Sequence, residues 1–324
     1  MRVIYLFKKY GFIGLIKKAI IKWLKLDKTI EKQQEAIDSL YYYMNNYVIT
    51  DLSLLPATND PDLRIMQKCD TALLLIFDRI CRKHNIDYWL DFGTLLGSVR
   101  HHGFIPWDDD MDVACLSKDY YKLLNALKDE LPDEDFNIDD DNEKPMGRIG
   151  FGYKHHKTGI WIDICPVDIY YTNEKLDKVK NEILSKRESW KIKYSKYKKK
   201  ATIEDLLNVK KAIFGNNLIE SSDYSIYHHG CEFPHQKPII CEKNIIYPLV
   251  EHTFEDYHFL VPNNYKSYLK LMYGNNFMQL PKSGILHHGA ERGKLSTWAK
   301  TSHIDMNEVY NYLIQTANNI KNNL

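Results

Sequence analysis

Hydrophobic positions between Pro61 and His84 recur at helical spacing, which predicts an amphipathic helix with one apolar face. Asp60 stands directly before this pattern and can cap the helix, while Pro61 suits its first turn and Asn85 can end it. We expect the apolar face of this helix to pack against a β-sheet.

Strand patterns follow this helix. Alternating or aromatic-rich sequences predict strands over residues 86–92, 110–115, 149–153 and 159–165. A further helix is expected over residues 117–131, with the serine at its start as the cap. Helices and strands in this order predict an α/β (α+β) core in which helices flank a sheet.

Beyond Tyr171 the pattern is largely helical, and two helices are expected at about 263–273 and 304–321. No internal repeat or low-complexity linker interrupts the chain. We therefore expect three parts, which are an N-terminal helix with a polar helical stalk (1–50), a catalytic core (51–175) and a mainly helical C-terminal lobe (176–324).

Four carboxylates fall within the five positions 108–112. So much like charge is unfavourable unless a cation offsets it, and Mg²⁺, Mn²⁺ and Ca²⁺ are the cations that prefer hard oxygen ligands. Because side chains alternate along a strand, Asp110 and Asp112 would project from one face while Met111 and Val113 enter a core on the other. The sequence therefore predicts a metal site.

Two other interpretations of these acids were open. Asp108, Asp110 and Asp112 match the first, third and fifth positions of an EF-hand loop, but Val113 stands where that loop requires glycine. Asp110-Met111-Asp112 also fits the Asp-x-Asp element with which many glycosyltransferases hold a metal and a nucleotide sugar. The EF-hand is excluded, and a glycosyltransferase remains the alternative enzyme. A catalytically inactive, membrane-associated binding module is the alternative outside the enzymes.

The residues before the acids predict a phosphate-binding turn. The strand over 86–92 ends at Gly93, and Thr94 can cap a short helix that begins at Leu95. The N-terminal amides of that helix would face an anion. This order would place phosphate-binding amides beside the metal-binding pair.

A third carboxylate lies on the strand over 159–165. Asp163 shares a face with Trp161 and Cys165, so it could accept the proton of an acceptor hydroxyl or complete a second metal site. Asp168 is a weaker candidate, because Pro166 is expected to end the strand before it.

A bound diphosphate would also need basic neighbours. Arg100 follows the short helix and could contact a phosphate or the carboxylates of Asp108 and Asp109. Arg148 and Lys154 flank the strand over 149–153 and are further candidates, although both could equally be surface charges.

Several motifs together identify a family resemblance. The main segments are WLDFGTLLG at 89–97, FIPWDDDMD at 104–112 and WIDICP at 161–166. Shorter ones follow in order, which are YPL at 247–249, FE at 254–255, VP at 261–262, YGNNFM at 273–278 and LP at 280–281. This pattern resembles the LicD-type phosphotransferases, relatives of the fukutin group in the nucleotidyltransferase-fold superfamily. The resemblance implies a nucleotidyltransferase-like mixed sheet.

The resemblance also implies an activity. Such enzymes move phosphocholine or a polyol phosphate from a CDP-activated alcohol to a sugar hydroxyl of a surface glycan, such as lipopolysaccharide, teichoic acid or capsule, and release CMP. Carried over by position, Asp110 and Asp112 match the metal pair for Mg²⁺ or Mn²⁺, Asp163 the third catalytic acid, and Gly93 and Thr94 the phosphate-side turn.

The N-terminal residues 1–28 carry eight bases and one acid, which gives them a charge of about +7 and leaves the remainder near −6. Their apolar residues recur at helical spacing, but no run is long enough to span a bilayer, and no cleavage site of a secretory signal follows. We expect a basic amphipathic helix that lies on the anionic inner face of the cell membrane, in a cytoplasmic protein. The alternative is a helix packed on the protein itself or on another subunit.

A second basic segment, residues 186–200, holds eight bases against one acid, with tryptophan and tyrosine between them. Nucleic-acid-binding segments can have this pattern. A solvated helix face or another membrane-facing patch is the favoured interpretation, so no nucleic-acid partner is expected. The expected partners are the CDP-alcohol, a glycan or lipid-linked glycan acceptor, and the membrane.

Histidines and cysteines gather in one loop-like stretch, with His228, His229, Cys231, His235 and Cys241. Their spacing matches no familiar zinc pattern, and the six cysteines of the chain include no Cys-x-x-Cys. Zinc is therefore not the favoured interpretation, and the thiols are expected to be reduced and mostly buried.

Overall fold

The computed structural model describes residues 28–40, 42, 52, 58–139, 149–154, 158–194, 203–218, 225–229, 238–280, 301 and 303–321. The chain forms two compact units, of which the first comprises Met1–Asp51 with Gln279–Gly284 and the second the remainder. In the first unit, residues 28–40 and 42 are helical with exposed side chains, as the stalk prediction requires. The basic segment 1–28, apart from its last residue, lies outside the described residues.

The second unit is built on a mixed sheet of seven strands. They are β1 (Tyr88–Leu90), β2 (Met111–Leu116), β3 (Phe136–Asp139), β4 (Ile149–Tyr153), β5 (Trp161–Tyr171), β6 (Ser225–His229) and β7 (Ile239–Glu242). The order is β1-β2-β5-β4-β3, and β6 continues the sheet from β5 to β7. Only β2 and β5 run parallel among these pairs of described strands. The predicted α/β core with a mixed sheet is confirmed.

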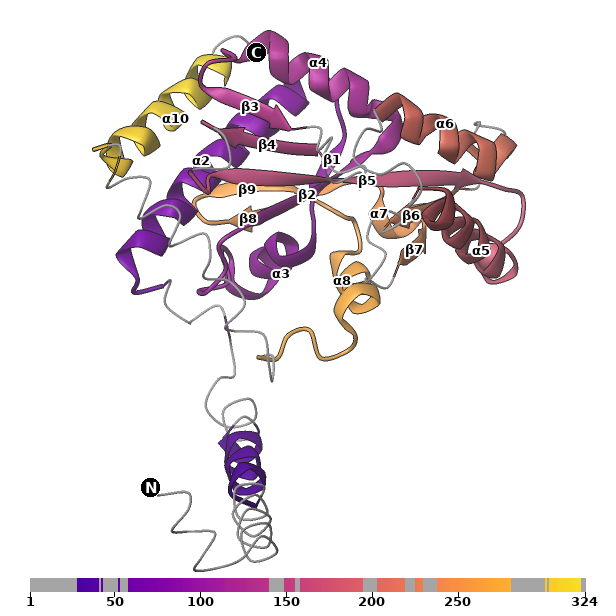
Figure 1. The fold of residues 1–324 in the computed structure, drawn as a ribbon, viewed down its shortest axis with the longest axis horizontal. Coiled ribbons are helices and arrows are strands. Elements are labelled where there is room, and N and C mark those ends of the chain that lie inside the picture. Colours follow the sequence, from indigo (N-terminus) through magenta and orange to yellow (C-terminus); the bar gives the residue numbers. More distant parts are fainter. Residues whose placement is uncertain are drawn as a thin grey trace, which may run out of the picture. The chain divides into compact units, whose positions relative to one another are not determined.

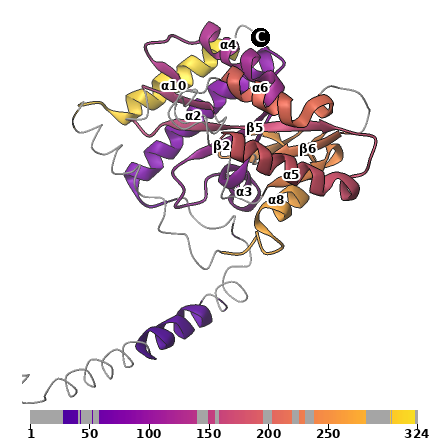
Figure 2. The same cartoon turned by 45° about the vertical axis from the view of Figure 1, so that its right-hand side comes forward.

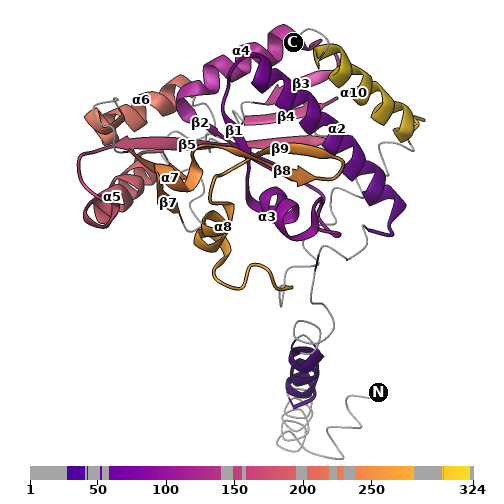
Figure 3. The same cartoon turned by 180° about the vertical axis from the view of Figure 1, so that it is seen from behind.

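Helices cover both faces of this sheet. They are α2 (Pro61–Lys83), α3 (Phe92–His101), α4 (Tyr120–Glu130), α5 (Leu176–Tyr194), α6 (Ile203–Phe214), α7 (Lys243–Ile246), α8 (Tyr265–Tyr273) and α10 (Met306–Lys321), with short 3₁₀ turns η3 (Ser117–Asp119) and η4 (Gly215–Leu218). Helices α4 and α6 lie on one side of β5, whereas α3 and α8 lie on the other (Figures 1 and 3). Helices α2 and α10 pack side by side (Figure 2).

Helix α2 forms where its pattern predicts. The Asp60 side chain accepts hydrogen bonds from the backbone N–H groups of Asp62 and Leu63, and the helix ends at Lys83, just before Asn85 adopts a positive φ of 50°. Its inner face is buried, and the Tyr88 hydroxyl of β1 donates to Asp78 over 2.6 Å. The expected packing of α2 on the sheet is confirmed.

Strand β5 corrects one expectation, because it runs through Pro166 to Tyr171. On one side β5 pairs with β4 as far as Ile164, and its pairing with β6 starts at Val167. Pro166 falls between these two neighbours, so among the described strands no ladder bond on that side needs its missing N–H. Asp168 is therefore a strand residue.

The stretch after Tyr171 is less helical than its pattern predicts. Strands β6 and β7 join the main sheet, and β8 (Val250–Phe254) and β9 (Tyr257–Val261) form a separate hairpin. Helices α8 and α10 lie close to their predicted positions. The four strands have only four or five residues each, too few for a clear alternation, so their pairing depends on tertiary contacts.

The helix expected from Ser117 begins later than predicted. Ser117 opens the 3₁₀ turn η3 and makes no cap bond, and α4 starts at Tyr120.

Within the described segments, none of the helices combines the length and the apolar composition that crossing a bilayer requires.

The structure separates two members of the histidine and cysteine cluster. His228 pairs with Ile240, whereas Cys241 pairs with Tyr227, so the two side chains point to opposite faces of the sheet. They cannot share one zinc ion, while Cys231 and His235 lie outside the described residues. The five cysteines of the described segments are buried and form no disulfide.

The cap of α2 gives a stability test. Replacing Asp60 with alanine removes the acceptor for two N–H groups, so we expect the free energy of unfolding to fall by about 1 kcal/mol. Asp60→Ser keeps an acceptor and should retain most of the parent chain's stability. Urea unfolding of both variants measures this, and equal stability of Asp60→Ala and the parent chain would contradict the capping role.

Candidate active site

The predicted acids of two separate strands meet in the structure. Strands β2 and β5 run parallel with Asp112 directly beside Asp163, so both carboxylates project from the same face of the sheet. Asp110 immediately precedes β2. Carboxylate oxygens of Asp108, Asp109 and Asp110 lie within 4.8 Å of one another. These five acids, Asp108, Asp109, Asp110, Asp112 and Asp163, are called the acid cluster.

The acids interact strongly with one another. Burial, and then the charges of Asp110 and Asp163, raises the pKa of Asp112 well above its ordinary value. Burial together with Asp110 and Asp109 does the same for Asp108. Two carboxylates can share such a site only if one holds a proton or a cation offsets the charge.

The acid cluster suits a hard divalent cation. All its donors are carboxylate oxygens, the ligands that Mg²⁺ and Mn²⁺ prefer over zinc or copper. Asp110 is exposed whereas Asp108 and Asp109 are buried, so an ion held there would keep one side open to a substrate. The residues present thus fit the implied metal.

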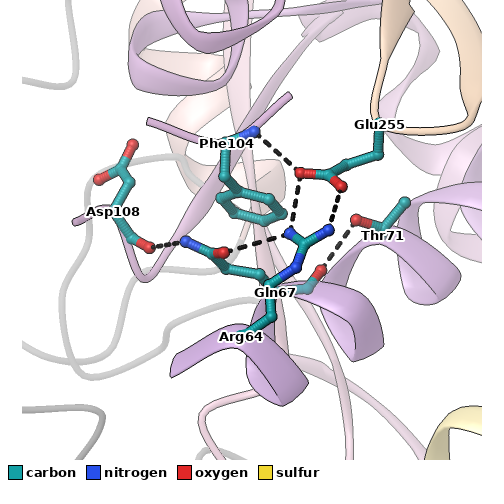
Figure 4. A network of polar contacts seen from close by, with 6 residues as sticks. All are labelled: Arg64, Gln67, Thr71, Phe104, Asp108 and Glu255. Carbon is teal, nitrogen blue, oxygen red and sulfur yellow. Dashed lines mark hydrogen bonds and ion pairs between the residues drawn. The ribbon is translucent and has the colours of Figure 1, made fainter. Parts of the chain in front are cut away.

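The sequence did not single out Asp108 as a ligand, but long-range contacts fix the backbone that carries it. The side chain of Gln67 on α2 donates to the Asp108 carbonyl over 2.9 Å and accepts from Arg64 over 3.3 Å (Figure 4). Arg64 in turn forms a two-bonded ion pair with Glu255, at 3.0 and 2.6 Å. One helix thereby holds both the acidic loop and the β8–β9 turn.

Glu255 also holds the loop that leads to the acids. Its carboxylate accepts from the Phe104 N–H over 3.2 Å (Figure 4). Its own N–H donates to the His102 carbonyl over 2.8 Å. A side chain at Gly103 would come within 2.6 Å of the Glu255 carboxylate, so this contact needs glycine. Glu255 follows β8, more than a hundred residues after the loop, and sequence spacing could not predict the contact.

The Gly93–Thr94 turn lies against the acids, although its details differ from expectation. The helix starts at Phe92 rather than Leu95, and Asp91 caps it by accepting from the Phe92 N–H over 2.9 Å. The Thr94 hydroxyl accepts from the Asp112 N–H over 2.8 Å, so Thr94 anchors β2 instead of capping the helix.

Gly93 lies against the acidic loop. A Cβ atom at this position would stand 2.9 Å from an Asp108 carboxylate oxygen. A side chain here would displace the Asp108 carboxylate, so glycine lets the first turn of α3 approach the acid cluster closely. The predicted proximity of the turn to the acids is thus present in the structure.

Arg100 is buried beside the same cluster. Its guanidinium donates to the Phe277 carbonyl and to His101, each over 3.0 Å. Burial lowers the pKa of Arg100 to about 10, while Tyr273 and Asp108 act in the opposite direction, so the side chain stays charged at neutral pH. The charge of Arg100 lies close enough to Asp108 for the two groups to interact electrostatically.

Tyr273 on α8 is a site residue that the sequence did not identify. Burial of its hydroxyl, and then the negative charges of Asp112, Asp91 and Asp108, raises its pKa. The phenol therefore stays protonated and can donate a hydrogen bond near the acid cluster.

Trp161 supports Asp163 directly. Its indole Nε1–H donates to Asp163 Oδ1 over 3.1 Å. The indole ring lies over two glycines of β4, since a Cβ at Gly150 or Gly152 would overlap it at 1.7 or 1.9 Å. Because the two glycines have no side chains, the Trp161 ring can lie against β4. In this orientation its N–H positions Asp163.

Asp70 of α2 is a further buried acid at the site. One carboxylate oxygen accepts from the Trp161 N–H over 3.1 Å, and the other has no hydrogen-bond partner among the described residues. Burial raises the pKa of Asp70, and Asp110 and Asp109 act in the same direction. Its place within a helix rather than in a motif explains why sequence alone missed it.

The structure places one of the basic candidates, Lys154, away from the acids. Lys154 pairs with Asp135 over 3.3 Å, and it lies beyond Gly152, which pairs with Trp161. It is therefore roughly 13 Å along β4 from Gly150, the neighbour of Asp163. Arg148 lies outside the described residues.

Comparison with known proteins gives a family match over this part of the chain. A family model described as LicD/FKTN/FKRP, nucleotidyltransferase domain, matches residues 85–204. The chain is similar to the lipopolysaccharide cholinephosphotransferase LicD of Haemophilus influenzae, at 41% identity over 64 residues, which are 20% of this chain and 24% of that protein.

Two uncharacterized Rickettsia proteins are also similar. RT0683 of Rickettsia typhi is 31% identical over 99 residues (30% of this chain, 26% of that protein), and RP689 of Rickettsia prowazekii is 51% identical over 45 residues (14% and 17%). The chain thus matches only 17% to 26% of the length of these relatives. The family match spans the Gly93 turn, the acid cluster and Asp163, so residues 85–204 of this chain are similar to the LicD-type nucleotidyltransferase domains.

Proposed function

We propose that this protein is a metal-dependent transferase. It moves a phospho-alcohol, either phosphocholine or a polyol phosphate, from a CDP-activated donor to a sugar hydroxyl of a cell-surface glycan and releases CMP. The name of the Haemophilus relative, a lipopolysaccharide cholinephosphotransferase, supports the phosphocholine class of this transfer. The observation that carries the proposal is the parallel register of Asp112 with Asp163 beside the acidic loop.

The metal role is assigned to Asp110, Asp112 and Asp163, with Asp108 as an additional ligand. A divalent ion bound there supplies neutralisation of the diphosphate oxygens. Without that charge balance, a donor with a diphosphate would be repelled by the same carboxylates that must bind it.

The remaining steps use the chain's own groups. The first turn of α3 presents backbone N–H groups next to Asp108, and Arg100 and Tyr273 add a cation and a hydrogen-bond donor on the other side. The sugar oxygen attacks the phosphorus atom bearing the alcohol, the phosphoanhydride bond breaks, and CMP leaves. A carboxylate of the cluster accepts the proton of the sugar hydroxyl.

The membrane role remains part of the proposal. A lipid-linked acceptor would lie at the membrane surface, where the basic residues 1–28 would hold the enzyme by their charge of about +7. This segment lies outside the described residues, so the proposal depends on its sequence pattern alone.

The activity can be tested with a panel of donors. CDP-choline, CDP-ribitol and CDP-glycerol, each with Mg²⁺ and a glycan acceptor, should yield CMP for one of them. Asp110→Asn removes charge at constant shape, so we expect turnover to fall at least about a hundredfold with little change in the unfolding midpoint. CMP formation at the parent rate would contradict the assignment, and turnover of a nucleotide sugar alone would favour the glycosyltransferase.

The pH dependence of stability tests the metal site separately. A carboxyl whose pKa is higher in the folded chain than in the unfolded chain holds its proton longer when folded, so stability falls as pH rises from about 4 toward the raised pKa. Burial and neighbouring charges create this situation at Asp108 and Asp112. Because a cation replaces the protons, we expect Mg²⁺ to stabilise the protein increasingly as pH rises.

Urea unfolding with Mg²⁺ or with EDTA at pH values from about 5 to about 8 measures this effect. Asp112→Asn should reduce the stabilisation by Mg²⁺ at high pH. A constant difference between the two conditions across the range would count against a cation in the acid cluster.

Trp161 offers a test of how Asp163 is held. Trp161→Phe keeps an aromatic ring over the glycines but removes the N–H that donates to Asp163, so we expect kcat to fall about tenfold with a smaller change in KM. Gly152→Ala should displace the indole and lower kcat similarly. Parent kcat values in both variants, with folding intact by circular dichroism, would show that the indole does not position the acid.

A further inference from the structure

A second candidate ligand site lies along the second half of β5. A cavity of about 260 Å³ is bounded there by the end of β2, the second half of β5 and helix α6. Its lining residues are Ser117, Lys118, Val167, Asp168, Ile169, Tyr171, Lys210 and Lys211. None of them belongs to the acid cluster.

The cavity is separate from the catalytic face. Asp163 and Asp168 are five positions apart on one strand, which places them roughly 16 Å apart and on opposite faces. Asp168 faces α6, whereas Asp163 faces the side of α3, and these helices lie on opposite sides of β5 (Figure 1). A ligand here would not compete for the catalytic ion.

The floor of the cavity holds a buried ion pair. The Lys210 ammonium lies 2.8 Å from an Asp168 carboxylate oxygen, with side-chain exposures of only 5% and 8%. The ammonium also lies 5.8 Å from the centre of the Trp190 ring. Although burial alone would raise the pKa of Asp168, Lys210, His228 and Ser117 together lower it, so the pair is charged.

Stability alone does not explain why the chain buries the Lys210–Asp168 ion pair. Burying two charges costs about as much as their attraction returns, and an apolar pair of similar volume is often as stable. Here the pair adjoins a hollow, and two further lysines, Lys118 and Lys211, are exposed at its margin. Three lysines against one aspartate leave a positive surface around the cavity.

The walls of the cavity define the rest of the ligand. Val167, Ile169 and Tyr171 add apolar and aromatic surface, and Ser117 adds a buried hydroxyl. A bare inorganic anion would use only the lysines, whereas a small organic anion would also cover the apolar wall. Phosphate esters combine both properties.

We propose that this cavity is a second binding site, for a small organic phosphate. Its phosphate group lies between Lys118 and Lys211, with Lys210 beneath it, and its carbon skeleton lies against Ile169 and Tyr171. The proposal does not depend on the transferase activity.

The test is a calorimetric titration of the full chain with glycerol 3-phosphate in EDTA. Without a divalent ion the acid cluster repels a phosphate, so binding reports the cavity. We expect saturable binding that is absent with glycerol and weakened at least about tenfold by Lys118→Gln/Lys211→Gln. Both lysines are exposed, so this variant should fold.

A matched control removes the same charge elsewhere. Lys128 and Lys180 are exposed and line no part of the cavity, so Lys128→Gln/Lys180→Gln should bind like the parent chain. The proposal is wrong if glycerol 3-phosphate does not bind saturably, if the cavity variant keeps the parent affinity, or if the control loses as much affinity as the cavity variant.

Discussion

Repulsion between buried carboxylates is the constraint on which this structure depends. Asp108, Asp109 and Asp110 crowd one loop, and Asp112 and Asp163 lie side by side on parallel strands. Each close pair of like charges costs roughly 1 to 4 kcal/mol at the dielectric of water or of a protein surface. Such an arrangement is unfavourable unless protons or a cation offset the charge.

The surrounding structure holds the acids in spite of that repulsion. Gln67 holds the Asp108 carbonyl, the Arg64–Glu255 pair ties the preceding loop to α2, and Thr94 accepts from the backbone of Asp112. The contacts of Gln67 and Thr94 use backbone groups of the acidic segment, so they hold it without using the carboxylates of Asp108 and Asp112. Close approach at Gly93 and Gly103 completes the arrangement, since a Cβ atom at either position would meet an acid.

The sequence predicted those helices and strands that have strong local signals. Helix α2 with its Asp60 cap, strands β2 and β4, and the acids of two strands all follow from periodicity and motif. The prediction that Pro166 ends its strand was wrong. A proline ends a strand only where a neighbouring strand needs its N–H, and here the pairing with β4 stops before Pro166 and the pairing with β6 starts after it. Strands β6 to β9 are too short for periodicity to reveal them.

The parts of the site that sequence missed are held by distant contacts. Gln67 and Asp70 belong to no local motif, and Glu255 lies in the FE motif without an assigned role, so the roles of all three appear only when the chain is folded. Thr94 was expected at the helix start because threonine is a good cap, but the backbone of β2 competes for the same hydroxyl, and Asp91 takes the cap position.

The most direct measurement is a crystal structure of the protein soaked in Mn²⁺ with an anomalous difference map. The account predicts a peak bounded by the carboxylates of Asp110, Asp112 and Asp163, with Asp108 at or beside the coordination shell. A clean map with no peak at the acid cluster, or manganese bound only at another place, would contradict the central claim.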